Sequence, residues 1–180
     1  MTDDLIISQL SADEIAASLA ELGALLHACV HAGASVGFVL PCPPAECEAF
    51  WCKVQQAVRD GSRILLVARS GGRIAGTVQL DHDTPANQPH RAEVRKLLVH
   101  PDFRRRGISR ALMTELERRA AGLGRRLLTL DTRTGDAAEP LYTGLGYQTV
   151  GVIPGYCLDP AEGRLDGTTI MYKTLGAAAA

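Results

Sequence analysis

The sequence has 180 residues, of which 46 % are hydrophobic and 22 % charged, and its formal net charge is −1. This length and balance fit one globular domain over residues 1–180 and exclude disordered and fibrous classes. The longest early apolar stretch, 15–30, is interrupted by a glutamate and a histidine, so we expect no membrane-spanning helix. The acidic first residues are unlike the basic start of a secretory leader, which favours a cytoplasmic location.

The hydrophobic periodicity and the turn residues predict the elements in chain order. They are a strand at 5–9, a helix from a Ser11/Glu14 capping box to about 30, a helix at 45–59, strands at 63–69, 73–80 and 91–99, a helix at 108–121, a strand at 126–131, a helix at 137–145, and strands at 147–152 and 168–173. A glycine-rich loop covers 31–38, and the tail 176–180 is expected to fray. This mixed order predicts an α+β fold, with about four helices flanking one mixed sheet of six to seven strands.

The cysteines and histidines give no sign of a disulfide framework or a metal site. Five cysteines without a CxxC pair are interpreted as reduced thiols. Cys42, Cys47 and Cys52 are five residues apart and are expected to be small buried hydrophobes. His27 and His31 share a helix face, but neither a HExxH glutamate nor cysteines at ligand spacing accompany them, so no metal is predicted.

Basic residues are concentrated between positions 91 and 126, where eleven arginines and lysines face four acids, a local charge of +7. Most of them are arginine, whose forked guanidinium suits phosphate oxygens. Within this segment a strand ends at Val99, a basic turn follows, and a helix begins after Gly107. Free N–H groups at a helix start bind phosphate, and a glycine there permits close approach, so we expect a pyrophosphate site.

The motif Arg104-Arg105-Arg106-Gly107-Ile108-Ser109, after a strand and before a helix, resembles the acetyl-CoA motif of the GCN5-related N-acetyltransferase (GNAT) superfamily. Ser109 stands where that family prefers glycine or alanine, and it is also small. The resemblance implies acetyl-CoA as co-substrate, a GNAT fold, and a set of cofactor-binding residues formed by the end of a strand and the basic turn: Leu97, Leu98, Val99, Arg104, Arg105, Arg106, Gly107, Ile108, Ser109 and Arg110.

Three side chains are candidates for catalysis. Acetyl transfer needs a base for the amine and a proton for the leaving thiolate. Glu93 and Asp131 lie on strands expected to flank the thioester, and Tyr142 matches the tyrosine that the family uses as proton donor. Each also has a structural interpretation: Glu93 pairs with neighbouring arginines, Asp131 bonds the turn at 132–135, and Tyr142 packs on the sheet.

The acceptor site is predicted from two loop segments. Flexible loops often determine specificity, so His31, Ser35 and Phe38 are expected to line one wall and Tyr156 the other. Structural alternatives are a plain helix exit for the first segment and a turn before the final strand for the second.

Several fragments resemble the tabtoxin-resistance acetyltransferases more closely, among them the glycine-rich loop and the segment Pro154-Gly155-Tyr156-Cys157. The predicted function is therefore direct acetyl transfer to an amine, or a hydroxyl, of a small amino-acid-like, toxin or antibiotic molecule, with tabtoxinine-β-lactam as the leading acceptor. Protein or peptide acetylation and a non-catalytic acyl-CoA sensor remain as alternatives, and a homodimer is kept as an option. Nucleic acid is disfavoured as a partner because few aromatics accompany the arginines.

Overall fold

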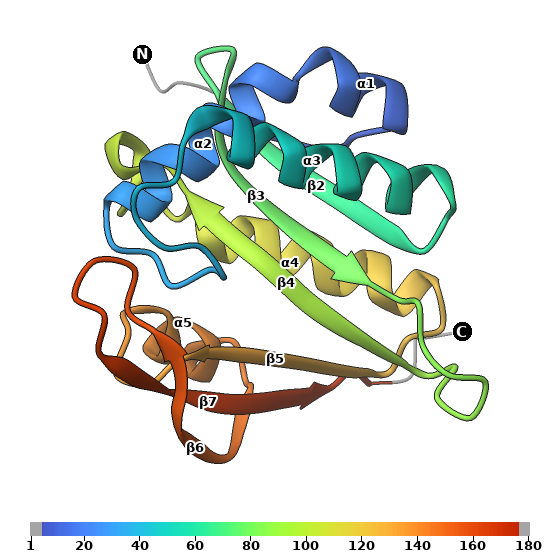
Figure 1. Ribbon diagram of the computed structural model, residues 1–180. Helices are drawn as coiled ribbons and strands as arrows, with labels where there is room; N and C mark the ends of the chain where they lie inside the picture. The colour runs from blue at the N-terminus through green and yellow to red at the C-terminus, as the bar shows by residue number, and fades with distance from the viewer. Residues whose placement is uncertain (1–4, 177–180) are drawn as a thin grey trace.

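The computed structural model describes residues 5–176, so the acidic first residues and the predicted frayed tail, apart from Gly176, lie outside the described residues. Seven strands form one mixed sheet in the order β1-β2-β3-β4-β5-β7-β6 (Figure 1). The strands are β1 (Ile6–Gln9), β2 (Arg63–Ser70), β3 (Arg73–Asp81), β4 (Arg91–Val99), β5 (Leu127–Arg133), β6 (Gln148–Leu158) and β7 (Leu165–Thr174). The α-helices are α1 (Ala12–Ala17), α2 (Leu19–His31), α3 (Pro44–Arg59), α4 (Ile108–Gly122) and α5 (Ala138–Gly144). The predicted α+β class and mixed central sheet are confirmed.

The first predicted helix is in fact two helices. The capping box at its start is present, since the Glu14 amide donates to the Ser11 hydroxyl at 3.3 Å and the Ser11 amide to the Glu14 carboxylate at 2.8 Å. Helix α1 ends at Ala17, because Ser18 leaves helical geometry with φ −109° and ψ 9°. The break turns the chain between Ile15 and Leu22, and both side chains are fully buried. Tertiary packing, which periodicity does not report, therefore divides the segment.

The sheet is covered on both faces. On one face, α3 packs against β2 while α2 packs against β3 and β4; on the other face, α4 packs against β2, β3 and β4 (Figure 1). Successive residues of a strand point to opposite faces, so Leu65 joins the core under α2 and α3 while Leu66 joins the core under α4. This is why β2 is a continuous apolar run rather than an alternating one.

No helix within residues 5–176 is both long enough and apolar enough to span a membrane. All five cysteines are free. Cys42 and Cys47 are buried as expected, but the prediction for Cys52 is wrong, because this side chain is exposed. It follows the buried Trp51 on α3 and so points about 100° away from the face that packs on the sheet.

The C-terminal hairpin is longer than predicted. β6 extends to Leu158 and β7 begins at Leu165, with Cys157 opposite Asp166 near the end. All but one of the residues of β6 are exposed, so the strand lacks the alternation that identifies a half-buried strand in a sequence.

Candidate active site

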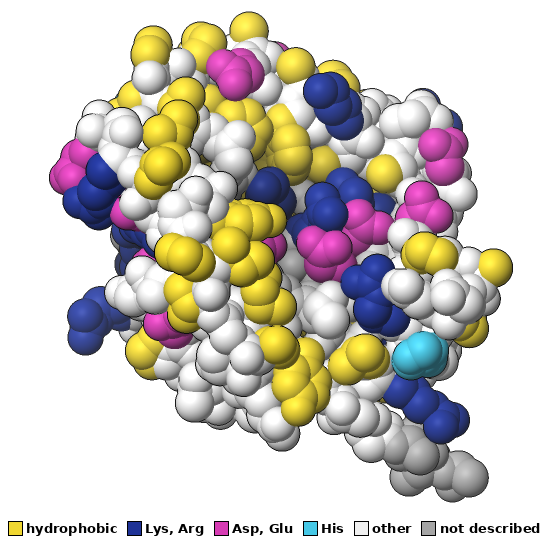
Figure 2. All heavy atoms as spheres, turned by 60° about the horizontal axis from the view of Figure 1, so that its bottom comes forward, with side chains coloured by type: hydrophobic (Ala, Val, Ile, Leu, Met, Phe, Trp, Pro, Cys, Tyr) yellow, Lys and Arg dark blue, Asp and Glu magenta, His cyan; other side chains and the backbone are white. Residues whose placement is uncertain are grey.

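A cavity opens where β4 and β5 separate. The two strands run parallel but pair only at Arg91–Leu127, Ala92–Leu128 and Glu93–Thr129. Beyond Glu93 they diverge, and a cavity of about 840 Å³ lies at the divergence. Figure 2 shows the molecular surface hollowed beside a group of basic and acidic side chains. Because backbone groups of β4 beyond Glu93 have no strand partner on this side, they are available to a ligand.

A bulge shapes the β4 wall of this cavity. Gln79 of β3 is opposite Arg95, but Thr77 is opposite Leu98, so Lys96 and Leu97 together oppose one β3 residue. Lys96 has a φ of 51°, which is in the left-handed region. Bulges of this kind change the direction of a side chain, and here the Lys96 ammonium donates to the carbonyl oxygen of Val36 at 2.6 Å.

The other wall contains the basic turn and the start of α4. Gly107 precedes this helix with a φ of 78°, and no heavy atom lies within 4 Å of the position a Cβ would occupy. No side chain caps the helix, so the first N–H groups and the positive end of the helix dipole are free to meet an anion. Two arginines of the turn, Arg104 and Arg105, also line the cavity. These features suit a pyrophosphate.

Nine of the ten predicted cofactor-binding residues line the cavity, namely Leu97, Leu98, Val99, Arg104, Arg105, Gly107, Ile108, Ser109 and Arg110. The exception is Arg106. Its guanidinium lies over the ring of Phe103, with its central carbon 5.3 Å from the ring centroid. This cation–π contact holds the guanidinium over Phe103.

The three predicted catalytic residues line the same cavity. Glu93 forms an ion pair with Arg95 at 3.1 Å, so the structural interpretation of Glu93 holds for this arginine. Arg91, in contrast, donates to Gln88 and Thr129.

Asp131 does not bond the turn that follows it. Its carboxylate accepts a hydrogen bond from the Thr168 hydroxyl at 3.4 Å and is otherwise exposed. Within residues 5–176, no lysine, arginine or histidine forms an ion pair with Asp131. Three carboxylates of the described residues line the cavity, and of these Glu93 and Asp136 are paired with arginines while Asp131 is not.

Tyr142 lies on α5 and is only 6 % exposed. Burial, together with the nearby negative charges of Asp131 and Asp136, raises its pKa above the usual value of 10. The phenol is therefore protonated at neutral pH and can donate a proton. Its hydroxyl makes no hydrogen bond to any other residue of the described chain.

The predicted acceptor wall is present only in part. Ser35 and Tyr156 line the cavity, and the Ser35 hydroxyl lies 3.6 Å from the sulfur of Cys157. His31 and Phe38 do not line it. The His31 ring stacks on His27 with centroids 3.9 Å apart, and Phe38 packs edge-on against Phe50 of α3 at 5.5 Å.

Other cavity residues were not predicted from the sequence. Arg133 joins three segments, because it donates to Asp159 at 3.1 Å, to the Gly33 carbonyl at 3.1 Å and to Asp136 at 3.3 Å. Its position two residues after Asp131 on the same strand was the available signal. Lys96 gave no such signal, because its direction depends on the bulge.

Cys29 is the most deeply buried thiol in the cavity lining. Burial raises the pKa of its thiol to about 11, and the sulfur donates to the Val99 carbonyl at 3.4 Å. A neutral thiol is a poor nucleophile. Among residues 5–176, no three His, Cys, Asp or Glu side chains are grouped as a metal site would require.

Comparison with known proteins identifies relatives of both the sequence and the fold. The model of the Acetyltransferase (GNAT) family matches residues 30–147. An acetyltransferase of Pectobacterium atrosepticum is 35 % identical over 101 residues, which cover 56 % of this chain and 68 % of the relative. For two Yersinia relatives the matched share of their length is 65 %.

Two solved structures show the same fold. A proposed acetyltransferase of Salmonella typhimurium, yncA, solved with its cofactor acetyl-CoA, has a TM-score of 0.77 at 18 % identity and covers 98 % of this chain and 96 % of its own. The ribosomal-protein-alanine N-acetyltransferase of Brucella melitensis has a TM-score of 0.74 at 22 % identity, with coverages of 94 % and 99 %.

Proposed function

This chain belongs to the acetyltransferase (GNAT) family, and from that premise we propose that it transfers the acetyl group of acetyl-CoA to the amine of a small, amino-acid-like molecule. The observation that carries the proposal is that one cavity brings together three features. They are the pyrophosphate cradle, which is Gly107 with the first amides of α4, the edge of β4 that no strand covers, and the side chains of Glu93, Asp131 and Tyr142. Acetyl transfer needs cofactor binding and proton transfer at the same place, and the point where β4 and β5 diverge offers both.

The residues present fit acetyl-CoA. The amides at the start of α4, with Arg104 and Arg105, hold the pyrophosphate, and the absence of a side chain at Gly107 lets it approach. The free edge of β4 at 97–99 bonds the amides of the pantetheine arm in the manner of an added strand. When bound, acetyl-CoA supplies the acetyl group as a thioester.

The side chains divide the proton transfers between them. Asp131 accepts the proton of the acceptor ammonium, because it is the one of the three cavity carboxylates that no cation of the described chain neutralises. Glu93 forms an ion pair with Arg95 and contributes a second negative charge to the electrostatic potential of the cavity. Tyr142 donates its proton to the departing sulfur, since its raised pKa keeps the phenol protonated. The neutral Cys29 argues for direct attack rather than an acetylated cysteine.

Two observations support the acceptor class: Ser35 and Tyr156 line the cavity, and the sequence resembles tabtoxin-resistance enzymes. Tabtoxinine-β-lactam is therefore the first specific candidate. A protein N-terminus is the second candidate, because a structural neighbour is a ribosomal-protein-alanine N-acetyltransferase. A non-catalytic acyl-CoA sensor would not need Asp131 and Tyr142 in the same cavity.

The test is mass spectrometry of a panel of small amines, amino acids, antibiotics, tabtoxinine-β-lactam and peptides incubated with the protein and acetyl-CoA. CoA release is followed in the same samples, and acetyl-CoA affinity is measured by calorimetry. We expect an acetylated small molecule, and we expect its formation to be lost in Asp131→Asn. Tight acetyl-CoA binding with no product from any acceptor class would favour the sensor, and acetylated peptides alone would favour the protein substrate.

A further inference from the structure

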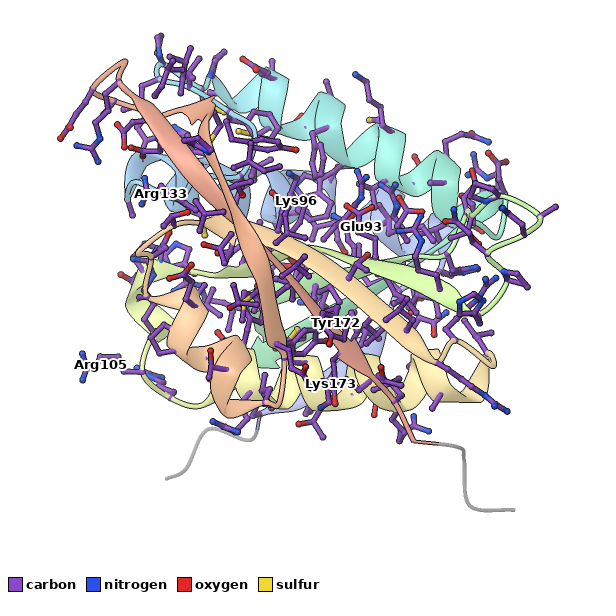
Figure 3. All side chains as sticks on the ribbon, turned by 90° about the horizontal axis from the view of Figure 1, so that it is seen from below. Glu93, Lys96, Arg105, Arg133, Tyr172 and Lys173 are labelled. Carbon is purple, nitrogen blue, oxygen red and sulfur yellow. The ribbon has the colours of Figure 1, made fainter. Side chains whose placement is uncertain are left out.

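Lys96 occupies an unusual position in the cavity. Glu93 and Arg95 point to the face of the sheet under α3, and alternation would direct Lys96 to the opposite face. The bulge brings it to the same side, so Glu93 and Lys96 both lie between the sheet and α3 (Figure 3). A non-glycine residue in left-handed geometry costs roughly 1 kcal/mol, and here that cost places an ammonium inside the cavity.

The contacts of Lys96 leave much of its hydrogen-bonding capacity unused. The half-buried ammonium donates to the Val36 carbonyl at 2.6 Å and lies 5.9 Å from the centroid of the Phe50 ring. An ammonium has three donors, and this hydrogen bond occupies one. Burial and the positive charge of Arg95 lower the Lys96 pKa, and Asp131 acts in the opposite direction.

Lys96 differs from the neighbouring cations in having no carboxylate partner in the described chain. Three cations line the part of the cavity between loop 33–37, β4 and the end of β5: Arg95, Lys96 and Arg133. Arg95 has Glu93 as an ion-pair partner, and Arg133 has Asp136 and Asp159. Within residues 5–176, Lys96 has no carboxylate within 4.0 Å. A partly buried charge without a counter-ion is costly, and an anionic ligand would remove that cost.

We propose that Lys96 binds the carboxylate of the acetyl acceptor, so that the acceptor is a free amino acid or a similar small zwitterion. The inference rests on the proposed acetyl transfer. The acceptor amine then faces the free carboxylate of Asp131, and the acceptor carboxylate faces Lys96, which gives the two ends of the zwitterion opposite partners. A protein N-terminus carries an amide in place of that carboxylate and would leave Lys96 without a counter-ion.

The test measures binding of product analogues and so does not depend on turnover. N-acetyl derivatives of the common amino acids, each as the acid and as the matched primary amide, are titrated by calorimetry into the protein saturated with CoA. We expect the best acid to bind about 10- to 100-fold more tightly than its amide, the range for a hydrogen bond to a charged partner. In Lys96→Gln, which keeps a donor for the Val36 carbonyl but has no charge, acid and amide should bind within about threefold of each other.

Lys53→Gln, the same substitution at an exposed lysine of α3, is the control and should keep the wild-type preference. Lys96→Arg, which keeps the charge, should keep part of it. The inference is overturned if the wild type does not prefer acids, if Lys96→Gln keeps the full preference, or if CoA binds but no N-acetyl acid does. In those three cases acetyl transfer remains, as tested by the product analysis above, whereas failure of CoA itself to bind would overturn both proposals.

Discussion

A Cβ atom on Gly76 would lie 2.6 Å from the carbonyl oxygen of Leu98, on the strand that forms the cavity wall. This distance is far inside van der Waals contact, so β3 and β4 can pack in this way only with glycine at position 76. Gly76→Ala should therefore lower the free energy of unfolding by roughly 1–3 kcal/mol and weaken acetyl-CoA binding, because β4 must shift. The strand glycine Gly151, with nothing within 4 Å, is the control: Gly151→Ala should change stability by less than about 0.5 kcal/mol in denaturant titrations.

Gly107 tests the pyrophosphate cradle. Gly107→Val adds a branched side chain where α4 begins and should raise the Kd for acetyl-CoA by at least about tenfold, measured by calorimetry. Gly72 has a φ of 80°, close to the 78° of Gly107, lies in the β2–β3 turn, and also has nothing within 4 Å. Gly72→Val should therefore cost a similar amount of backbone strain, roughly 1–2 kcal/mol, without changing the Kd. Equal Kd values for the two variants would remove the cradle from the cofactor site.

Tyr142 tests the proton donor. Tyr142→Phe should lower kcat by roughly 100-fold, because the departing sulfur loses its proton source, while acetyl-CoA affinity stays within about twofold. Tyr147 is the matched control, since its ring lies 5.7 Å from that of Tyr142 and its buried hydroxyl has no hydrogen-bond partner in the described chain. Tyr147→Phe should leave kcat unchanged. A full kcat in Tyr142→Phe at saturating substrates would exclude the proposed role.

A substitution of Arg133 tests the contacts that join β5 to loop 33–37, to Asp136 and to Asp159. Arg133→Met removes the ion pairs to Asp136 and to the buried Asp159 and the bond to the Gly33 carbonyl. We expect the free energy of unfolding to fall by roughly 1–3 kcal/mol, because Asp159 loses its nearest cation and, in the described chain, keeps only the amides of Ala161 and Glu162 and the more distant Arg164. Arg126, exposed and without a side-chain partner in the described chain, is the control, and Arg126→Met should stay within about 0.5 kcal/mol.

Glu115 on α4 predicts a pH dependence. Hydrogen bonds from Arg118 and Arg119 lower the pKa of Glu115 from 4.5 to about 2. The carboxylate binds its proton more weakly in the folded state, so the pair stabilises the fold above pH 4.5 and this contribution is lost as the pH falls toward 2. Because the arginines are exposed, the effect should be below about 1 kcal/mol.

In Glu115→Gln the stability deficit at pH 7 should disappear by pH 2 when unfolding is followed with denaturant. The control, Glu48→Gln, replaces an exposed acid of α3 that has no ion pair in the described chain, and it should show no such difference. An unchanged stability of Glu115→Gln at pH 7 would contradict the prediction.

Much of the fold could be predicted because most strands contain a short apolar run closed by glycine, proline or polar residues. The turn before Gly107 could also be predicted, because a basic loop between a strand and an amphipathic helix is a local sequence pattern. The division at Ser18 was not, because it depends on how α1 and α2 pack against the rest of the chain. The full length of β6 was hidden for a related reason, since an exposed strand lacks apolar alternation.

The site divides in the same way. Glu93 and Asp131 are candidates because a carboxylate can act as the base, whereas Tyr142 is a candidate through the resemblance to the family's tyrosine. Their strands and helix could be predicted well enough to place them near one another. Lys96 could not be found, because nothing in Arg95-Lys96-Leu97 marks a bulge, and the pairing with β3 imposes it. His31 and Phe38 were predicted from loop proximity alone, and each has an aromatic partner that holds it elsewhere.

Because β4 and β5 diverge, the sheet has two inner strand edges in addition to its two outer edge strands. An outer edge with unpaired N–H and C=O groups invites strands of other molecules and thereby aggregation. The inner edge of β4 also lacks a strand partner beyond Glu93, but it lies in the wall of a cavity of about 840 Å³ rather than at the rim of the sheet. An extended ligand such as a pantetheine arm can pair with a strand edge inside a cavity, whereas a whole β-sheet of another molecule is too wide to enter it.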